Sequence, residues 1–337
     1  MRPSKQDGLF YILTSVPARR VAAGVLYCGA PMSVPIQLAY GATISYYRSM
    51  NARFVRFSTE DGLILQGLLY TPDRSAPKAL LHIHGMSGNF YENRFLDVMA
   101  EALTGAGYAF FSINTRGHDY MADFSLVGNE EKYKRIGNTY EIFAESPMDI
   151  KPAIDWLEHE GYKEIVLCGH SLGAAKVAYY IAKTRDARVQ RLVLMSPPDM
   201  VGLAEKEGYH NDVLKLAHEM VDSGKGDDRL PNKVWDWYWL SAKTYIDLFS
   251  RDSPADIFNV YDLGKPSLLA DAKVPIFAFF GGKDDAAIGS PQKNLEILRS
   301  KARGAPAFDI AVIEDASHGY FGKEKEMAQA IITWLVK

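Results

Sequence analysis

From residue 52 onward, short apolar runs alternate with amphipathic stretches. Continuous apolar runs bounded by glycine, proline or charged residues predict buried strands, and apolar residues spaced three or four apart predict helices. The predicted strands, of which the first two form a hairpin, are 54–57, 63–70, 79–84, 108–113, 164–168, 189–195, 274–280 and 308–313. The predicted helices are 93–104, 149–161, 172–184, 291–303 and 324–336.

This alternation predicts an α/β fold with a mostly parallel, doubly wound sheet. Nearly continuous apolar strands are typical of sheets that are covered by helices on both faces. In such sheets the active site lies outside the carboxyl ends of the strands. Motifs in the loops that follow strands are therefore the first places to look for chemistry.

Two segments interrupt the alternation. Residues 199–270 are richer in charge and contain the aromatic run 234–240, VWDWYWL. We expect a mostly helical cap, inserted between two strands and lying over the carboxyl edge. A shorter insertion spans 120–146. The predicted domains are an N-terminal extension at 1–50, a core at 51–198 and 271–337, and a cap at 199–270.

Composition and net charge limit the classes of function that the chain can have. The 337 residues have a formal net charge of −3, which gives no electrostatic footprint for nucleic acid or an anionic membrane. The two cysteines, Cys28 and Cys168, rule out a disulfide framework and a cysteine-based zinc site. So low a number of cysteines fits a reducing compartment, and we expect a cytoplasmic protein.

The first 50 residues do not follow a secretory pattern, because Arg19 and Arg20 lie in the middle of the apolar stretch rather than before it. Prolines and polar residues also interrupt the run, so stable membrane insertion is not expected. We expect an extension that packs on the body or on a partner, which makes it a candidate contact in a homo-oligomer. A targeting or membrane-contacting segment is the alternative.

The strongest chemical signal is Gly169-His-Ser-Leu-Gly173, a G-x-S-x-G at a predicted strand-to-helix junction. A nucleophilic serine must sit on a very tight turn so that its hydroxyl stands clear of the backbone. That turn leaves no room for side chains two residues before and after it, hence the glycines. Ser171 is therefore the predicted nucleophile.

A serine hydroxyl needs a base, and the chain has eight histidines. His318 lies in the loop after the last predicted strand, which reaches the carboxyl edge, and it is the predicted general base. His118 follows another strand and is either a pocket residue or a rim or structural residue. His82 and His84 are treated as structural residues.

The oxyanion formed during acyl transfer needs two preorganised backbone N–H groups. One is expected from Leu172, the residue after the nucleophile. The other is expected from Met86, in the loop after the strand 79–84, where Gly85 allows a sharp turn.

The acid that orients the histidine is expected near 281–285, GGKDD, directly after a buried strand. Adjacent side chains point in different directions, so Asp284 and Asp285 cannot both fill this role. With either one, the order serine, acid, histidine is that of α/β hydrolases.

The chain resembles the α/β-hydrolase superfamily, in its serine esterase/lipase-like branch, from about residue 52 to the end apart from the cap. The HG-x-x-GN loop is similar to that of feruloyl- and cinnamoyl-type esterases. The segments with this resemblance are 84–89 (HGMSGN), 114–119 (NTRGHD), 169–173 (GHSLG), 281–285 (GGKDD) and 315–321 (DASHGYF).

The resemblance also implies a choice of acid, because superfamily members commonly place it in a G-x-x-D-x-x-[V/I] pattern. Counting from Gly282 gives Asp285 followed by Ile288, whereas counting from Gly281 gives Asp284 followed by Ala287. The first register has the larger apolar residue, so Asp285 is the predicted acid. Some relatives place the acid one strand earlier, which nominates Asp199.

These residues predict a serine esterase that acts on a small or medium, apolar or aromatic ester through an acyl-enzyme, with no cofactor and no metal. Hydrolysis of a lactone, thioester, amide or carbon–carbon bond, acyl transfer, and a non-catalytic binding module are the alternatives. Trp235 and Trp239 are candidate substrate-binding residues, although packing within the cap also accounts for them.

Overall fold

The computed structural model describes residues 50–74 and 76–337. Internal contacts divide the chain into two units, Met1–Tyr47 and Arg48–Lys337, and the description below concerns the second unit. The predictions for the N-terminal extension fall almost entirely outside the described residues.

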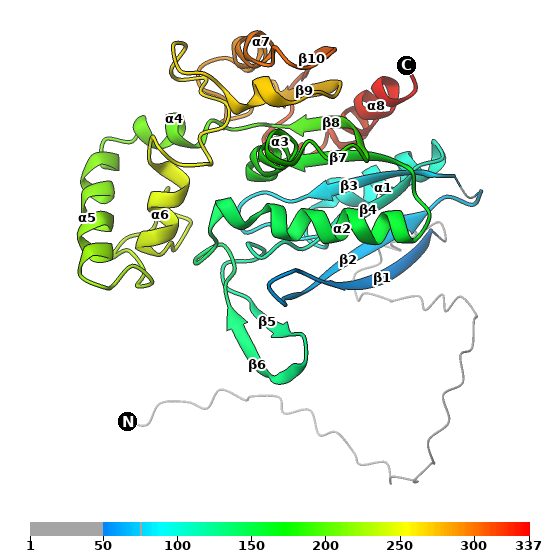
Figure 1. The fold of residues 1–337 in the computed structure, drawn as a ribbon. Helices are drawn as coiled ribbons and strands as arrows, with labels where there is room; N and C mark the ends of the chain where they lie inside the picture. The colour runs from blue at the N-terminus through cyan, green and yellow to red at the C-terminus, as the bar shows by residue number, and fades with distance from the viewer. Residues whose placement is uncertain (1–49, 75) are drawn as a thin grey trace, which may run out of the picture. The chain divides into compact units, whose positions relative to one another are not determined.

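The centre of this unit is an eight-stranded sheet in the order β1-β2-β4-β3-β7-β8-β9-β10 (Figure 1). β2 is antiparallel to β1 and β4, and the remaining neighbours are parallel, as predicted. The strands are β1 (Asn51–Ser58), β2 (Ile64–Thr71), β3 (Lys78–Ile83), β4 (Ala109–Ile113), β7 (Glu164–His170), β8 (Val189–Met195), β9 (Ile276–Gly281) and β10 (Phe308–Ile313).

Helices cover both faces of the sheet because alternate strand residues present apolar side chains to each face. Leu80 and Phe110 belong to the hydrophobic cluster under one set of helices, α1 (Arg94–Gly105) and α8 (Glu324–Leu335). Leu81 and Phe111 belong to the cluster on the opposite face. There the covering helices are α2 (Pro147–His159), α3 (Leu172–Thr184) and α7 (Pro291–Lys301).

The segment 199–270 contains three α-helices joined by turns and irregular stretches, and the helices account for less than half of its residues. Its helices α4, α5 and α6 follow the carboxyl end of β8 and lie together at one side of the sheet (Figure 1). The bounds of these helices are α4 (Met200–Glu205), α5 (His210–Asp222) and α6 (Ala242–Phe249), and the short 3₁₀ helix η2 (Leu268–Asp271) follows them. This segment belongs to the same compact unit as the sheet, so its separation as a cap domain stays a prediction.

The insertion at 120–146 contains a hairpin that the sequence pattern did not predict. Its elements are β5 (Asp123–Leu126), β6 (Asn129–Arg135) and the short η1 (Phe143–Glu145). β6 is largely polar, and the side chain of Arg135 donates two hydrogen bonds to Asp123, at 2.7 and 2.8 Å. A strand held by charge pairs has no apolar period that would reveal it.

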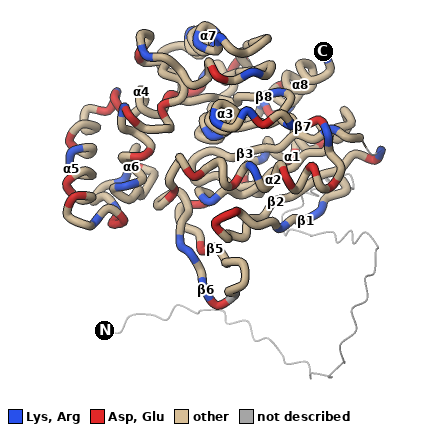
Figure 2. Tube along the Cα trace, in the orientation of Figure 1, with Lys and Arg blue, Asp and Glu red and all other residues tan. Residues whose placement is uncertain are grey.

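Acidic and basic residues are interspersed over the elements of this unit (Figure 2). Within the residues that the structure describes, no helix has both the length and the apolar character needed to cross a membrane.

Candidate active site

Ser171 occupies the sharp turn between β7 and α3 that its motif predicts. Its backbone has φ 55° and ψ −129°, a strained conformation for a residue with a side chain. A Cβ on Gly169 would lie 2.2 Å from the carbonyl oxygen of Gly173, and one on Gly173 would lie 2.2 Å from that of Ile83. Both glycines are therefore required by close packing, and the serine stands at the carboxyl end of β7.

The loop 84–89, which follows β3, approaches Ser171 directly. A Cβ built on Gly85 would lie 2.8 Å from the Cβ of Ser171 and 3.3 Å from its Oγ. Met86 is the next residue in this loop, and Leu172 begins α3 on the other side of the serine. The structure thus brings both predicted donor residues beside the predicted nucleophile.

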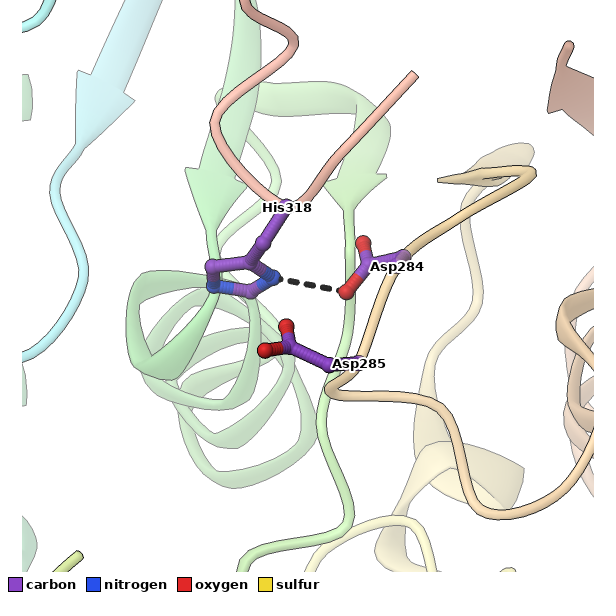
Figure 3. A group of neighbouring side chains, drawn as sticks. All are labelled: Asp284, Asp285 and His318. Atoms are coloured by element: carbon purple, nitrogen blue, oxygen red, sulfur yellow. Dashed lines mark hydrogen bonds and ion pairs between the residues drawn. The ribbon is translucent and has the colours of Figure 1, made fainter. Parts of the chain in front are cut away.

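His318 lies in the loop between β10 and α8, and its Nδ1 is 2.9 Å from Oδ1 of Asp284 (Figure 3). The loop is tied to the elbow, because Nε2 of His170 donates to the carbonyl oxygen of His318 at 2.9 Å. The two imidazole rings lie 4.8 Å apart between centroids. His318 is therefore fixed against the residue that precedes Ser171.

Asp284 is buried and each of its carboxylate oxygens accepts hydrogen bonds. Besides His318, Oδ1 accepts from the N–H of Ala286 at 3.0 Å, and Oδ2 accepts from the hydroxyl of Ser196 at 2.5 Å. The hydroxyl of Tyr320 lies 2.7 Å from Ser196 Oγ and completes the chain. Burial raises the pKa of Asp284, but the hydrogen bonds and the charge of His318 outweigh it and hold the pKa below its usual value.

The choice of Asp285 as the histidine's partner is wrong in this geometry. Asp285 is exposed, and the hydrogen bond to His318 comes from Asp284. Figure 3 shows the Asp285 carboxylate below the imidazole ring, away from the dashed hydrogen bond.

The reason is a turn that begins one residue earlier than the pattern assumed. The N–H of Asp284 donates to the carbonyl oxygen of Gly281 at 3.2 Å, closing the turn directly after β9. A Cβ on Gly281 would lie 2.3 Å from the carbonyl oxygen of Ala316, so this glycine allows the histidine's loop to come close. In this register the small Ala287 is the buried apolar residue, and side-chain size misled the prediction.

The other acid candidate, Asp199, has a structural role. Asp199 caps α4, since it accepts hydrogen bonds from the backbone N–H groups of Gly202 and Tyr261, both at 2.9 Å. Burial raises the pKa of Asp199 to about 6. Asp315 forms an ion pair with Lys283 at 2.7 Å.

The aromatic run of the cap divides into packing and site-facing residues. Trp235 packs against Tyr238 and Phe249, at ring distances of 6.3 and 5.2 Å. Trp239 stacks near the side chains of Arg229 and Lys233. It also lines an open hollow of about 360 Å³ with Tyr140, Asp227, Asp228, Arg229 and Leu230.

Tyr238 is the residue of this run that reaches the loops around Ser171. Its hydroxyl lies close enough to the side chain of Ser87, in the loop 84–89, to interact with it. Burial and the nearby Tyr120 and Asp285 raise the pKa of Tyr238. The run forms a turn closed by a bridge between Val234 and Tyr238, so no strand or helix period in the sequence singles out Tyr238.

Ser196 and Tyr320 were also missed. Ser196 directly follows β8 at the carboxyl edge, and Tyr320 is two residues after His318. Their positions pointed to the site, but serine and tyrosine are too common for position alone to single them out.

Asp284, Asp285 and His318 also form a group whose ligand atoms lie within 4.8 Å of one another, close enough to surround a metal ion. However, the imidazole Nδ1 and the Asp284 carboxylate already hydrogen-bond to each other, and Ser196 and Ala286 satisfy the remaining positions of that carboxylate. The geometry of the three side chains is therefore that of a hydrogen-bonded His318–Asp284 pair with the exposed Asp285 beside it.

Comparisons with known proteins agree with the fold described above. The family model described as alpha/beta hydrolase fold matches residues 78–228. AB hydrolase superfamily protein YisY of Bacillus subtilis is 24% identical over 282 residues, which cover 78% of this chain and 93% of that protein.

Solved structures of esterases have a similar fold at low sequence identity. Est1E from Butyrivibrio proteoclasticus, solved with ferulic acid bound, is 18% identical with a TM-score of 0.59, covering 84% of this chain and 98% of its own. The Pyrococcus furiosus esterase Pf2001 is 19% identical with a TM-score of 0.57, covering 85% of this chain and 91% of its own. The sheet order, the elbow and these matches together show that the chain has the α/β-hydrolase fold.

Proposed function

We propose that the chain is a serine hydrolase that cleaves carboxylic esters through an acyl-enzyme on Ser171. The observation that supports this most is the hydrogen bond between His318 and the buried Asp284, on a loop anchored beside the serine elbow. Binding alone does not require a strained serine next to an oriented imidazole, whereas nucleophilic catalysis does.

In this proposal the Ser171 hydroxyl attacks the ester carbonyl and its proton passes to Nε2 of His318. Asp284 accepts the Nδ1–H and stays ionised, because its pKa is lowered, so it stabilises the imidazolium that forms. The backbone N–H groups of Met86 and Leu172 would stabilise the oxyanion. His318 then protonates the leaving alcohol, and a water molecule attacks the acyl-enzyme in the same way.

The substrate is proposed to be a small or medium ester with an apolar or aromatic part. Tyr238, whose hydroxyl interacts with Ser87, brings an aromatic ring of the segment 199–270 near the 84–89 loop. Tyr120 lies 6.1 Å from it between ring centroids and adds a second aromatic side chain at the same place.

A panel of p-nitrophenyl and alkyl esters that varies acyl length and alcohol size, with a feruloyl ester included, tests the proposal. We expect turnover of at least one class by the wild type and none by Ser171→Ala. Hydrolysis that survives in Ser171→Ala, or labelling of a different residue by a fluorophosphonate, would contradict it.

A further inference from the structure

A lysine and a glutamate lie buried behind the 84–89 loop. The side chains of Lys176, on α3, and Glu141 are 0% and 1% exposed, and the ammonium donates to the carboxylate. A Cβ on Gly117 would lie 2.0 Å from Glu141 Oε2, so only glycine leaves room for this carboxylate. Burying two charges costs free energy, and apolar replacements of such pairs are often neutral or stabilising. Stability alone therefore does not explain the pair.

Lys176 connects the pair to His84 through Thr115. Its Nζ lies 3.4 Å from Thr115 Oγ1, and that hydroxyl lies 3.0 Å from Nε2 of His84. Since the ammonium can only donate, the hydroxyl accepts from Lys176 and its own hydrogen is directed to the imidazole.

The backbone determines which nitrogen of His84 carries the proton. The N–H of Thr115 donates to Nε2 of His84 at 3.0 Å, and a backbone N–H cannot accept. The proton of the neutral ring must then be on Nδ1, which lies 2.8 Å from the carbonyl oxygen of Gly85. Burial, followed by the charge of Lys176, holds the pKa of His84 well below its usual value, so the ring stays neutral.

His84 in turn fixes the peptide between Gly85 and Met86. The Gly85 oxygen accepts from His84 Nδ1 and from the N–H of Gly88, the latter at 3.1 Å. In a trans peptide the C=O and N–H point in opposite directions, so the N–H of Met86 is directed away from those two donors. A flipped peptide would instead present a carbonyl oxygen where the proposed oxyanion forms, which would repel it.

We propose that the buried Lys176–Glu141 pair is a positioning element for this peptide, acting through Thr115 and the Nδ1–H form of His84. The inference rests on the proposed function, because the Met86 N–H is a catalytic donor only if Ser171 attacks a carbonyl. The pair itself touches no reacting atom. Its effect is to keep one of the two proposed oxyanion donors in a fixed orientation.

Thr115 gives the mildest test, because Thr115→Val keeps the shape and removes the hydroxyl, while Thr115→Ser keeps the hydroxyl. We expect Thr115→Val to lower kcat about 10-fold with little change in KM, the upper range for the loss of one hydrogen bond, and Thr115→Ser to restore it. The affinity for a trifluoromethyl ketone transition-state analogue should fall in parallel with kcat. A purely structural role would lower the melting temperature and leave both unchanged.

The pair itself is tested by the charge-neutral double variant Lys176→Met/Glu141→Gln, with Lys183→Met, an exposed lysine on the same helix, as the matched control. We expect kcat to fall about 10- to 100-fold in the double variant and to stay unchanged in the control. Wild-type kcat and analogue affinity in both the double variant and Thr115→Val would overturn the inference.

Selective ¹⁵N-histidine NMR separates failure of the inference from failure of the proposed function. Absence of turnover in the wild type would refute the function, whereas the NMR result does not depend on turnover. We expect His84 to carry its proton on Nδ1 in the wild type, and that proton to exchange with solvent at least 10-fold faster in the double variant. An Nε2–H or charged His84 in the wild type, or unchanged exchange in the variant, would overturn the inference.

Discussion

Replacing Asp284 by asparagine, with Asp285→Asn as its matched neighbour, separates the two adjacent carboxylates. Asp284→Asn changes one buried oxygen to an amide NH₂ at nearly constant volume. Asp285→Asn makes the same change on an exposed side chain. Because the chemical change is the same in both variants, a difference in their activity reflects where each carboxylate lies.

The hydrogen bonds of Asp284 show why either orientation of the new amide is unfavourable. If the NH₂ replaces Oδ1, it faces the Ala286 N–H, and His318 Nδ1 must accept rather than donate. The proton then sits on Nε2, which cannot take the proton of Ser171. If the NH₂ replaces Oδ2, it faces Ser196, which must give up its donor role, and the negative charge beside the imidazolium is lost.

We expect kcat to fall about 10⁴-fold in Asp284→Asn, the usual cost of losing the orienting carboxylate. The kcat of Asp285→Asn should stay within about 3-fold of the wild-type value, because the charge of a solvent-exposed carboxylate is screened. The assay is kcat/KM on the best ester of the panel, with active sites counted by fluorophosphonate labelling and thermal melting confirming the fold. A large loss of kcat/KM in Asp285→Asn together with a small loss in Asp284→Asn would contradict the assignment of Asp284 as the orienting acid.

Three further predictions follow from the same site. Because the pKa of Asp284 is lowered in the folded state, its ionised form should stabilise the wild type relative to Asp284→Asn above pH about 4. Urea unfolding should show this difference disappearing as the pH falls through the lowered pKa, and a difference that grows in acid would contradict it. Met86→Ala should lower kcat far less than the 2.7–4 kcal/mol (roughly 10²–10³-fold) typical of a lost oxyanion donor, because its backbone is the proposed donor, and a loss as large as that of Ser171→Ala would refute this. Tyr238→Phe removes the hydroxyl that interacts with Ser87 and should raise KM about 2- to 10-fold, so unchanged kinetics with an aromatic ester would argue against a role of the cap in binding.

Much of the fold was readable from the sequence because the buried elements have strong patterns. Every residue of β4 and of β9 is buried, so these strands appear in the sequence as nearly continuous apolar runs. The elbow was equally readable, since the glycines at 169 and 173 are required by contacts of 2.2 Å. These features depend on local sequence and on burial alone.

The acid was not predictable in the same way, because its identity depends on contact between distant loops. Which glycine begins the turn after β9 is decided by the close approach of Ala316, in the loop of His318. The sequence contains both registers, and only the packed structure selects Asp284. The same holds for Ser196 and Tyr320, whose roles exist only once three loops meet.

The central claim is that Ser171 is a nucleophile activated by His318. Its most direct test is labelling of the wild type, His318→Ala and Ser171→Ala with a fluorophosphonate, followed by mass spectrometry of the modified peptide. We expect stoichiometric modification at Ser171 in the wild type, much slower labelling in His318→Ala and none in Ser171→Ala. A wild type that binds esters yet leaves Ser171 unmodified, or one that labels equally fast without His318, would contradict it.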